Sequence, residues 1–413
     1  MQGPRIRLDK IAGGKKELYE NHEVVFTDRN PGRGEIKVGF KSFIKELKKG
    51  SRILLSDGLI ELRVKSKTKA KAKCFVVQGG SIVSYSSINL PGTEIKLPSF
   101  TEKDDQDLYF GIQNQVDYVA LSFVKNKRDI QRIRKKILEY CQKEGAPHPK
   151  IIAKIENKEA VKNLESIITV ADGLMVARGD LGIELPEEEV PLLQKRMIDE
   201  ARHYGKPVIT ATQMLDSMVK NPRPTRAEVS DVANAIVDGT DAVMLSNETA
   251  MGKYPLKAIL EMKKIIEETE GGLYSHTNMH KFSFHYPKGD YREISTTDAV
   301  GSSSCEMAEH LSARYIITTT SSGYSARMVA KHRPETKIFA LTPSQIVYNQ
   351  LALVWGVRPL ILPNFHTTDE LIYQSVDLLR DRKMTKRGDL LIIIAGHPVG
   401  LAGQTNLIKV HKV

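Results

Sequence analysis

Short apolar runs separated by polar and glycine-rich segments divide the chain into parts with different rhythms. In the first ninety residues, runs rich in Val, Ile, Leu and Phe, such as EVVFTD, SRILLSDGLIELRV and KCFVVQGGSIVSY, are separated by the turn signals NPGRG, SDG and QGG. From about residue 100, strand-like and helix-like stretches follow one another, as βα units do. The pattern predicts a small β-rich domain followed by a domain of βα units.

Five apolar stretches in the second part have the length of buried strands: VDYVALSFV, KIIAKIE, DGLMVARGD, PVITATQM and DAVMLSNET. Polar residues mark their ends at intervals of 26 to 34 residues, namely Ser122, Lys154, Asp180, Thr212 and Ser246. This interval is the length of one βα unit, and in a (β/α)8 barrel the C-terminal strand ends form the active-site face. We therefore expect a TIM-type α/β barrel with its chemistry at that face.

The rhythm breaks at residues 266–289, where Gly, Pro and aromatic residues predict a connector. A helical stretch follows at 296–313, and then the strands YIITTT, KIFALT, RPLILP and DLLIIIAG alternate with helical stretches. This pattern predicts a third, open α/β domain from residue 290 to residue 413.

Composition agrees with a folded protein of two to three domains, because 413 residues exceed one core of usual size and 41% of them are hydrophobic. The most apolar short stretch, DLLIIIAG, is far shorter than the roughly 18 residues of a membrane-spanning helix. The N-terminal MQGPRIRLDK lacks the apolar core of a secretory signal. We expect a cytoplasmic protein that does not bind membranes, with its three widely spaced cysteines reduced.

The formal charge of +11 is concentrated between residues 41 and 73, which carry eleven Lys or Arg and three acidic residues. From Arg63 to Lys73 basic residues alternate with small or apolar ones, so on one extended strand every charge would lie on one face. We interpret this face as solvated, or as lysines that keep a strand edge from pairing, with a phosphate-facing surface as the alternative. No aromatic residues are interleaved for stacking nucleic-acid bases. Nucleic acid is therefore not an expected partner.

Charged residues at two neighbouring strand ends indicate the chemistry. Lys154 and Glu156 are two positions apart and point to the same face, and one βα unit later ARGDLG supplies Asp180. Two carboxylates with a lysine between them suit Mg²⁺ and a phosphoryl group, and Thr212 adds a hydroxyl one strand further on. Spacing alone leaves phosphate or enolate chemistry on Mg²⁺ and a barrel with another anionic substrate equally open.

Longer motifs carry a resemblance. IIAKIENKEAV, LMVARGDLGIELP, ITATQMLDSM, NPRPTRAEVSDVANAIVDGTDAVML and INLPGTEIKLPSFTEKD closely resemble the pyruvate kinase family, and the similarity runs along essentially the whole chain. The resemblance implies transfer of a phosphoryl group from phosphoenolpyruvate to ADP, giving ATP and pyruvate in glycolysis. It also implies a catalytic barrel of residues 1–7 and 88–265, an inserted β-barrel lid of residues 8–87 and a C-terminal regulatory domain of residues 290–413.

The resemblance implies roles for individual residues. Lys154 stabilises the transferring phosphoryl group, while Glu156 and Asp180 coordinate Mg²⁺ or Mn²⁺. The backbone amides of Gly179 and Asp180, together with the hydroxyl of Thr212, hold the substrate carboxylate.

Other positions match more weakly. Thr212 belongs to a proton-donating relay that includes Ser246, and Ser122 and Phe123 line the substrate pocket. Arg5 stands where K⁺-dependent members have a glutamate, which weakens the case for a K⁺ requirement but leaves K⁺ open as a cofactor.

The third domain offers an effector site. The segment TSSGYS is a hydroxyl- and glycine-rich turn at a predicted strand-to-helix junction. It resembles the segment that binds the phosphate of a sugar-phosphate activator in some pyruvate kinases. Separately, the resemblance to the family implies a homotetramer. The candidate effector contacts are Thr320, Ser322, Gly323 and Ser325.

The resemblance is incomplete at the beginning, because the family has two barrel strands and most of a third before the position of Met1. We therefore expect an N-terminally incomplete barrel with five full strands, from a sequence that is part of a longer chain or that starts too late. Two other interpretations stay open. One is a truncated or non-catalytic pyruvate kinase remnant, and the other is a different phosphoenolpyruvate/pyruvate barrel enzyme that does not require ADP.

Overall fold

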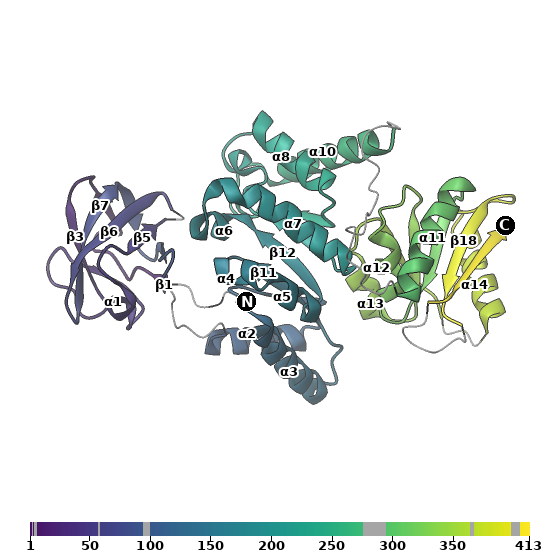
Figure 1. The fold of residues 1–413 in the computed structure, drawn as a ribbon, viewed down its shortest axis with the longest axis horizontal. Coiled ribbons are helices and arrows are strands. Elements are labelled where there is room, and N and C mark those ends of the chain that lie inside the picture. Colours follow the sequence, from purple (N-terminus) through teal and green to yellow (C-terminus); the bar gives the residue numbers. More distant parts are fainter. Residues whose placement is uncertain are drawn as a thin grey trace.

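The computed structural model describes residues 1, 3, 6–56, 58–93, 100–275, 295–363, 367–397 and 405–413. Figure 1 shows three bodies in a row: a β-rich lid, a central part with a parallel sheet, and a C-terminal α/β part. This is the predicted order of a lid, a barrel portion and an open α/β domain.

The lid is built around one seven-stranded sheet in the order β1-β9-β5-β6-β7-β3-β4, and β2 pairs with β8 apart from it. Its alternating strands bury one face, as in β7, where Ala72, Cys74 and Val76 are inaccessible to solvent. Its elements are β1 (Ile6–Arg7), β2 (Lys15–Leu18), β3 (Glu23–Thr27), β4 (Ile36–Lys37), α1 (Phe43–Glu46), β5 (Arg52–Leu55), β6 (Ile60–Lys67), β7 (Lys71–Gln78), β8 (Gly80–Val83) and β9 (Ser87–Asn89).

The basic stretch is not one extended strand, so that prediction was wrong. It folds into the β6–β7 hairpin, and Thr68 closes the turn because its hydroxyl accepts hydrogen bonds from the amides of Ala70 and Lys71. The charged side chains still share the exposed face, where Lys65 and Lys73 both pair with Glu23 at 2.6 and 2.5 Å. The face is solvated and internally paired, as the sequence interpretation held.

The lid sheet also includes segments that we assigned to the barrel. Ile6 pairs with Ile88, and Leu54 of β5 pairs with Asn89, so β1 and β9 are strands of the lid sheet. The predicted boundaries at residues 7 and 88 therefore fall inside one hydrogen-bonded sheet. The chain enters and leaves the lid through these adjacent antiparallel strands, which explains how an insertion can sit on the central part.

The central part has a parallel sheet in the order β10-β11-β12-β13-β14. The family of elements is α2 (Glu102–Gln113), β10 (Tyr118–Leu121), α3 (Lys127–Glu144), β11 (Lys150–Ile155), α4 (Lys158–Lys162), α5 (Leu164–Val170), β12 (Gly173–Ala177), α6 (Arg178–Glu184), η1 (Glu187–Glu189), α7 (Val190–His203), β13 (Val208–Ala211), η2 (Asp216–Val219), α8 (Arg226–Val237), β14 (Ala242–Met244), α9 (Asn247–Ala250) and α10 (Pro255–Ser275). Within the described residues, these five strands are the expected partial barrel.

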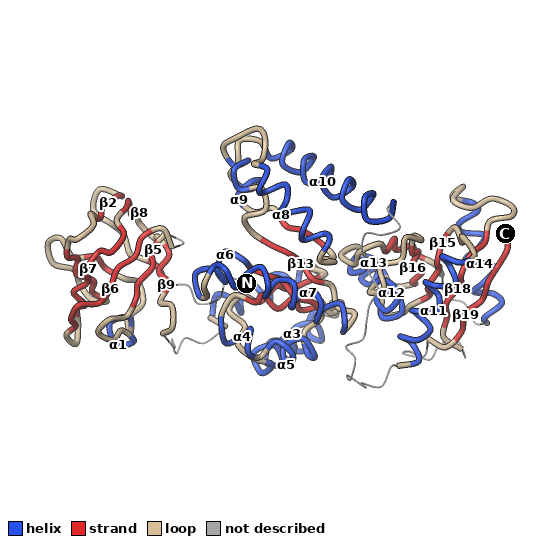
Figure 2. Tube along the Cα trace, turned by 45° about the horizontal axis from the view of Figure 1, so that its top comes forward, coloured by secondary structure: helices blue, strands red, loops and turns tan. Residues whose placement is uncertain are grey.

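Helices cover one face of this sheet and leave the other to form the inner wall. Ile151 and Ile155 of β11 pack with α3, α5 and α7 in the main core, and Figure 2 shows these helices outside the strands. Ile152 points the opposite way, into a smaller cluster with Met175 and Ala211. Because side chains alternate along a strand, Lys154 shares the inner face with Ile152.

The C-terminal part is an open sheet in the order β17-β16-β15-β18-β19, in which β19 is antiparallel and was not predicted. Helix α10 continues to Ser275, so the first ten residues of the predicted connector 266–289 are helical, and the rest lie outside the described residues. Its elements are α11 (Thr296–His310), β15 (Tyr315–Thr319), α12 (Tyr324–Ala330), β16 (Ile338–Thr342), α13 (Gln345–Leu351), β17 (Val357–Ile361), α14 (Thr368–Asp381), β18 (Leu390–Ala395) and β19 (Leu407–Lys412). None of the described helices is long and apolar enough to cross a membrane.

Buried polar contacts join the central and C-terminal parts. Asp241 accepts hydrogen bonds from the Arg333 guanidinium at 3.1 Å and from the Trp355 amide at 3.0 Å, and that guanidinium stacks over the Trp355 ring. Tyr118 donates its hydroxyl proton to the Gln350 carbonyl at 2.6 Å. Such buried groups are costly to separate, because each would lose its partner.

One lysine at this junction predicts a pH dependence. Burial and the nearby Arg327 lower the pKa of Lys150 from 10.5 to about 7, and its ammonium lies 3.4 Å from the Ser322 carbonyl. The unfolded chain keeps this proton up to about pH 10.5, so between pH 7 and 10 unfolding takes up a proton and stability rises with pH. Between pH 7 and pH 10, we expect the free energy of unfolding of the wild type to rise by about 1–3 kcal/mol more than that of Lys150→Met. This range is reduced because Lys150 is partly exposed.

Denaturant unfolding at pH 7 and pH 9.5 measures this difference, with the exposed Lys158→Met as the matched control. Parallel stability curves for the wild type and Lys150→Met would contradict the assignment.

Candidate functional site

The end of β11 carries the charged centre that the sequence predicted. Buried Ile and Ala residues fix the strand, and they leave Lys154 on the inner face with 18% of its side chain exposed. Its ammonium donates a hydrogen bond to the Ser122 hydroxyl at 2.9 Å and forms an ion pair with Glu156. The structure thus brings Ser122, Lys154 and Glu156 together.

Glu156 is fully buried and links two strand ends. Its Oε2 accepts a hydrogen bond from the Phe123 amide at 2.7 Å, and Phe123 adopts a left-handed conformation with φ of 55°. Its Oε1 lies beside the Lys154 ammonium but has no hydrogen bond of acceptable geometry. One carboxylate oxygen therefore anchors the loop after β10, and the other is buried beside a single cation.

Asp180 acts on the same centre. Burial raises the pKa of Glu156, the negative charge of Asp180 raises it further, and Lys154 partly opposes both effects. The negative charge of Asp180 therefore destabilises the negative charge of Glu156. A cation bound near both carboxylates would be stabilised by them.

Helix α6 places Gly179 and Asp180, which we had assigned to a strand. Strand β12 ends at Ala177, and residues 178–184 are helical. The Gly179 amide donates a hydrogen bond to the Thr212 hydroxyl at 2.9 Å, so these two predicted residues meet. Thr212 follows β13 directly and has φ of 70°, and Gln213 after it has φ of 56°.

Ser246 lies two residues after β14, immediately before α9. Its amide donates to Oε2 of Glu248 at 2.8 Å, and Oε1 of that carboxylate accepts from the Leu215 amide at 3.1 Å. Glu248 is 1% exposed and ties the loop after β14 to the loop after β13. Sequence reasoning missed this residue, although a lone acidic residue in LSNETA at a strand end was a signal for a loop anchor.

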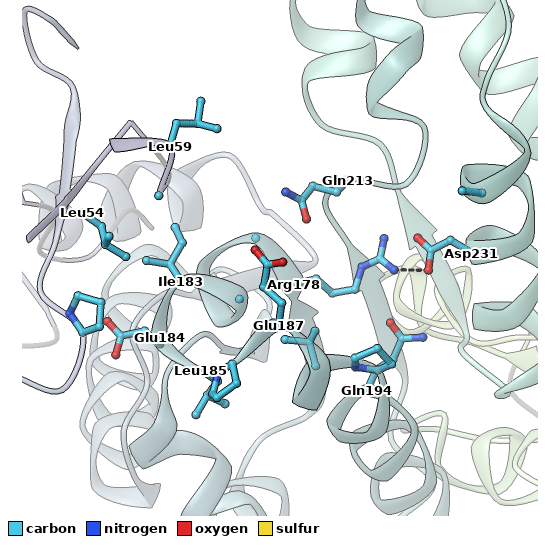
Figure 3. Close-up of a pocket in the computed structure, with 18 of the residues that line it drawn as sticks. Leu54, Leu59, Arg178, Ile183, Glu184, Leu185, Glu187, Gln194, Gln213 and Asp231 are labelled. Atoms are coloured by element: carbon cyan, nitrogen blue, oxygen red, sulfur yellow. Dashed lines mark hydrogen bonds and ion pairs between the residues drawn. The ribbon is translucent and has the colours of Figure 1, made fainter. Parts of the chain in front are cut away.

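Arg178 was named in the sequence only as part of ARGDLG. Its guanidinium donates to the Thr212 carbonyl and to Asp231 of α8, at 2.7 Å each. Figure 3 shows this ion pair on the wall of a cleft of about 1420 Å³ between the lid and the central part. Leu54 and Leu59 line the cleft from the lid, and Gly179 lines it from α6, so the cleft adjoins the predicted site.

Three of the predicted effector residues lie in the turn between β15 and α12, and Ser325 lies in the first turn of α12. Gly323 has φ of 78°, and its amide donates to the Thr320 hydroxyl at 2.9 Å. The Ser325 hydroxyl lies 2.6 Å from the Thr405 hydroxyl, and the Ser322 carbonyl faces Lys150 of β11. One hydrogen bond within the turn closes it, and the contacts with Thr405 and Lys150 join this region to the rest of the molecule.

Comparison with known proteins agrees with this geometry. Residues 1–259 match the family described as pyruvate kinase, barrel domain, and residues 298–411 match pyruvate kinase, alpha/beta domain. The chain belongs to the pyruvate kinase family. Over its whole length it is 45% identical to a pyruvate kinase of Geobacillus stearothermophilus, spanning 69% of it, and 42% identical to one of Clostridium acetobutylicum, spanning 86%.

A solved pyruvate kinase structure has the same fold. The protein from Cryptosporidium parvum superposes with a TM-score of 0.87 at 35% identity, covering 99% of this chain and 82% of that one. The chain is therefore an enzyme, a phosphotransferase with pyruvate kinase function, as the sequence motifs predicted.

The buried loop anchor at Glu248 generates a stability prediction. Glu248→Ala leaves two backbone amides without their acceptor, one of them on the fully buried Leu215. We expect a loss of about 2–4 kcal/mol in the free energy of unfolding, measured by urea denaturation.

The neighbouring Thr249→Ala is the control, because Thr249 is exposed on the same short helix α9. A Glu248→Ala midpoint equal to that of the control would show that the anchor contributes nothing.

Proposed function

We propose that the charged centre at the ends of β10, β11 and β12 transfers the phosphoryl group of phosphoenolpyruvate to ADP. The observation that carries this proposal is the grouping of Lys154 with the buried Glu156, beside the negative charge of Asp180. Desolvating three charges costs several kcal/mol unless they are paired or bind an ion, so a structural role alone does not account for them.

Lys154 neutralises charge on the moving phosphoryl group. Ser122 and Glu156 hold its ammonium in place, and its side chain keeps some access to solvent and thus to substrate. A preorganised cation stabilises the transition state without reorganising during the reaction.

The two carboxylates fit a divalent metal, Mg²⁺ or Mn²⁺. Glu156 Oε1 is a buried oxygen that forms an ion pair with Lys154, and Asp180 adds a second negative charge nearby. Among the described residues, no three His, Cys, Asp or Glu side chains group closely enough to hold a metal. Mg²⁺ commonly takes one or two carboxylates and completes its shell with water and substrate phosphate, where it neutralises developing charge.

A K⁺ requirement is not part of this proposal. The argument against it rests on Arg5, which lies outside the described residues.

Thr212 holds the substrate carboxylate and passes a proton. Its hydroxyl accepts from the Gly179 amide, so its own proton stays available to donate. The amide of Asp180, at the start of α6, completes the carboxylate site. Ser246 extends the relay from β14, and Ser122 and Phe123 line the pocket.

The cleft beside the centre accommodates ADP. It measures about 1420 Å³, more than a typical small-ligand site, and it shares Gly179 with the substrate site. A nucleotide between the lid and the central part would lie beside Gly179, which the substrate site also uses, and direct transfer requires such proximity.

The turn at Thr320, Ser322, Gly323 and Ser325 is the proposed site for a sugar-phosphate effector. It follows β15, where the strand order reverses between β16 and β18, and open α/β sheets bind ligands at such switch points. A homotetramer is the proposed assembly, and the exposed apolar side chains of Leu256, Ile259 and Leu260 on one side of α10 offer a surface for contact between copies. The proposed location is the cytoplasm.

Substitution of the lysine tests the proposed reaction. We expect Lys154→Ala to lower kcat for pyruvate formation from phosphoenolpyruvate and MgADP by about 10²–10⁴-fold, because the transition-state charge loses its cation. Circular dichroism should show an unchanged fold.

Lys158→Ala, on the exposed start of α4, should keep wild-type turnover. Wild-type turnover in Lys154→Ala would remove Lys154 from the mechanism. Pyruvate formation that did not depend on ADP would instead favour another phosphoenolpyruvate/pyruvate barrel enzyme.

Substitution of the proposed ligand tests the metal site. Glu156→Gln keeps the shape and the acceptor for the Phe123 amide but removes the negative charge. We expect the affinity for Mn²⁺, measured by electron paramagnetic resonance, to fall by roughly 10- to 100-fold or more. That is the loss seen when a residue that only hydrogen-bonds to a metal ligand is replaced, and a direct ligand should matter at least as much. Glu159→Gln, exposed on α4, is the matched control, and equal affinities in the two variants would overturn the assignment.

A further inference from the structure

The loop after β13 holds an unusual backbone conformation. Thr212 and Gln213 are consecutive non-glycine residues with φ of 70° and 56°. Such residues cost of order 1–3 kcal/mol each and persist only where surrounding contacts hold them. The conformation aims the Thr212 hydroxyl at the Gly179 amide, 2.9 Å away.

The guanidinium of Arg178 supplies the holding contacts. Its Nη2 and Nε both donate to the Thr212 carbonyl, at 2.7 and 3.3 Å, and Nη2 also lies 2.8 Å from the Met214 sulfur. Its Nη1 donates to Asp231 of α8 at 2.7 Å, which fixes the plane of the guanidinium (Figure 3). Only 10% of the Arg178 side chain is exposed, so water competes weakly for these bonds.

Two successive residues, Arg178 and Gly179, therefore hydrogen-bond to different atoms of Thr212. Arg178 holds its carbonyl oxygen, and the amide of Gly179 holds its hydroxyl. The first contact sets the backbone, and the second sets the side-chain rotamer. Both come from the first turn of α6, the helix that also carries Asp180, so the hydroxyl is located relative to that carboxylate.

We propose that Arg178 is a positioning residue, which acts on phosphoenolpyruvate through Thr212 and not by contact with that substrate. The inference rests on the role proposed above for the Thr212 hydroxyl in holding the substrate carboxylate and donating a proton. A lysine cannot replace the arginine, because a single ammonium lacks the planar fork that bonds a carbonyl and a carboxylate in fixed directions.

Kinetics of the two single variants and the double variant provide the test. We expect Arg178→Gln to lower kcat/KM for phosphoenolpyruvate by about 10- to 100-fold, the size of effect that a small misplacement of a reacting group produces. Arg178→Lys should recover little of this loss, and Arg128→Gln, exposed on α3, should match the wild type. In a Thr212→Val background, Arg178→Gln should change kcat/KM by less than about 3-fold, because the group it positions is gone.

Exchange of the pyruvate methyl protons with deuterated water, followed by NMR, adds a readout of proton transfer that needs no ADP. We expect Arg178→Gln and Thr212→Val to slow it alike. If Arg178→Gln does not fold, Asp231→Asn replaces it in the comparison with Thr212→Val and the double variant. This substitution removes the negative charge that holds the Arg178 guanidinium but keeps the shapes of both side chains.

Three outcomes would overturn the inference, and they separate it from the proposed function. Wild-type kinetics in Thr212→Val would remove the proposed role of Thr212 and the inference with it. Impaired kinetics in Thr212→Val with wild-type kinetics in Arg178→Gln would remove only the inference. If the fold-losses in kcat/KM of the two single variants multiply in the double variant, Arg178 acts independently of Thr212, through the fold.

Discussion

The buried carboxylate of Glu156 is the constraint around which the catalytic part is organised. A fully buried carboxylate is stable only if charge and hydrogen bonds compensate it. The Phe123 amide, the Lys154 ammonium and the neighbouring Asp180 all bear on its charge, and they come from three adjacent strand ends. The parallel sheet makes this possible, because every strand delivers its C-terminal end to one edge.

The same elements connect the reactive edge with the rest of the molecule. Strand β11 begins at Lys150, which faces the Ser322 carbonyl of the C-terminal part, and it ends at the catalytic centre. Helix α7 begins on the wall of the lid cleft and ends at His203, whose carbonyl accepts a hydrogen bond from Lys331. The rigid elements that position the chemistry therefore also contact both flanking parts.

The errors made from the sequence have physical causes. The basic stretch was interpreted as one strand because charge alternation continues through Thr68, whose hydroxyl closes a turn that alternation cannot reveal. The segment from Arg178 was assigned to a strand because Gly and charged residues follow an apolar run, yet it begins helix α6. Strand β19 was missed because only half of its short sequence, LIKVHK, is apolar, while its pairing with β18 is long-range.

The sequence by itself determined the family, the order of the three parts and the strand ends that carry Lys154, Glu156 and Thr212. Local patterns suffice for these features, because strand periodicity and long motifs are encoded in neighbouring residues. Only the tertiary structure decided which groups meet: Ser122 with Lys154, the Gly179 amide with the Thr212 hydroxyl, and the Arg178 guanidinium with the Thr212 carbonyl. These contacts join residues more than thirty positions apart, so they depend on strand order, register and loop conformation, which no local pattern contains.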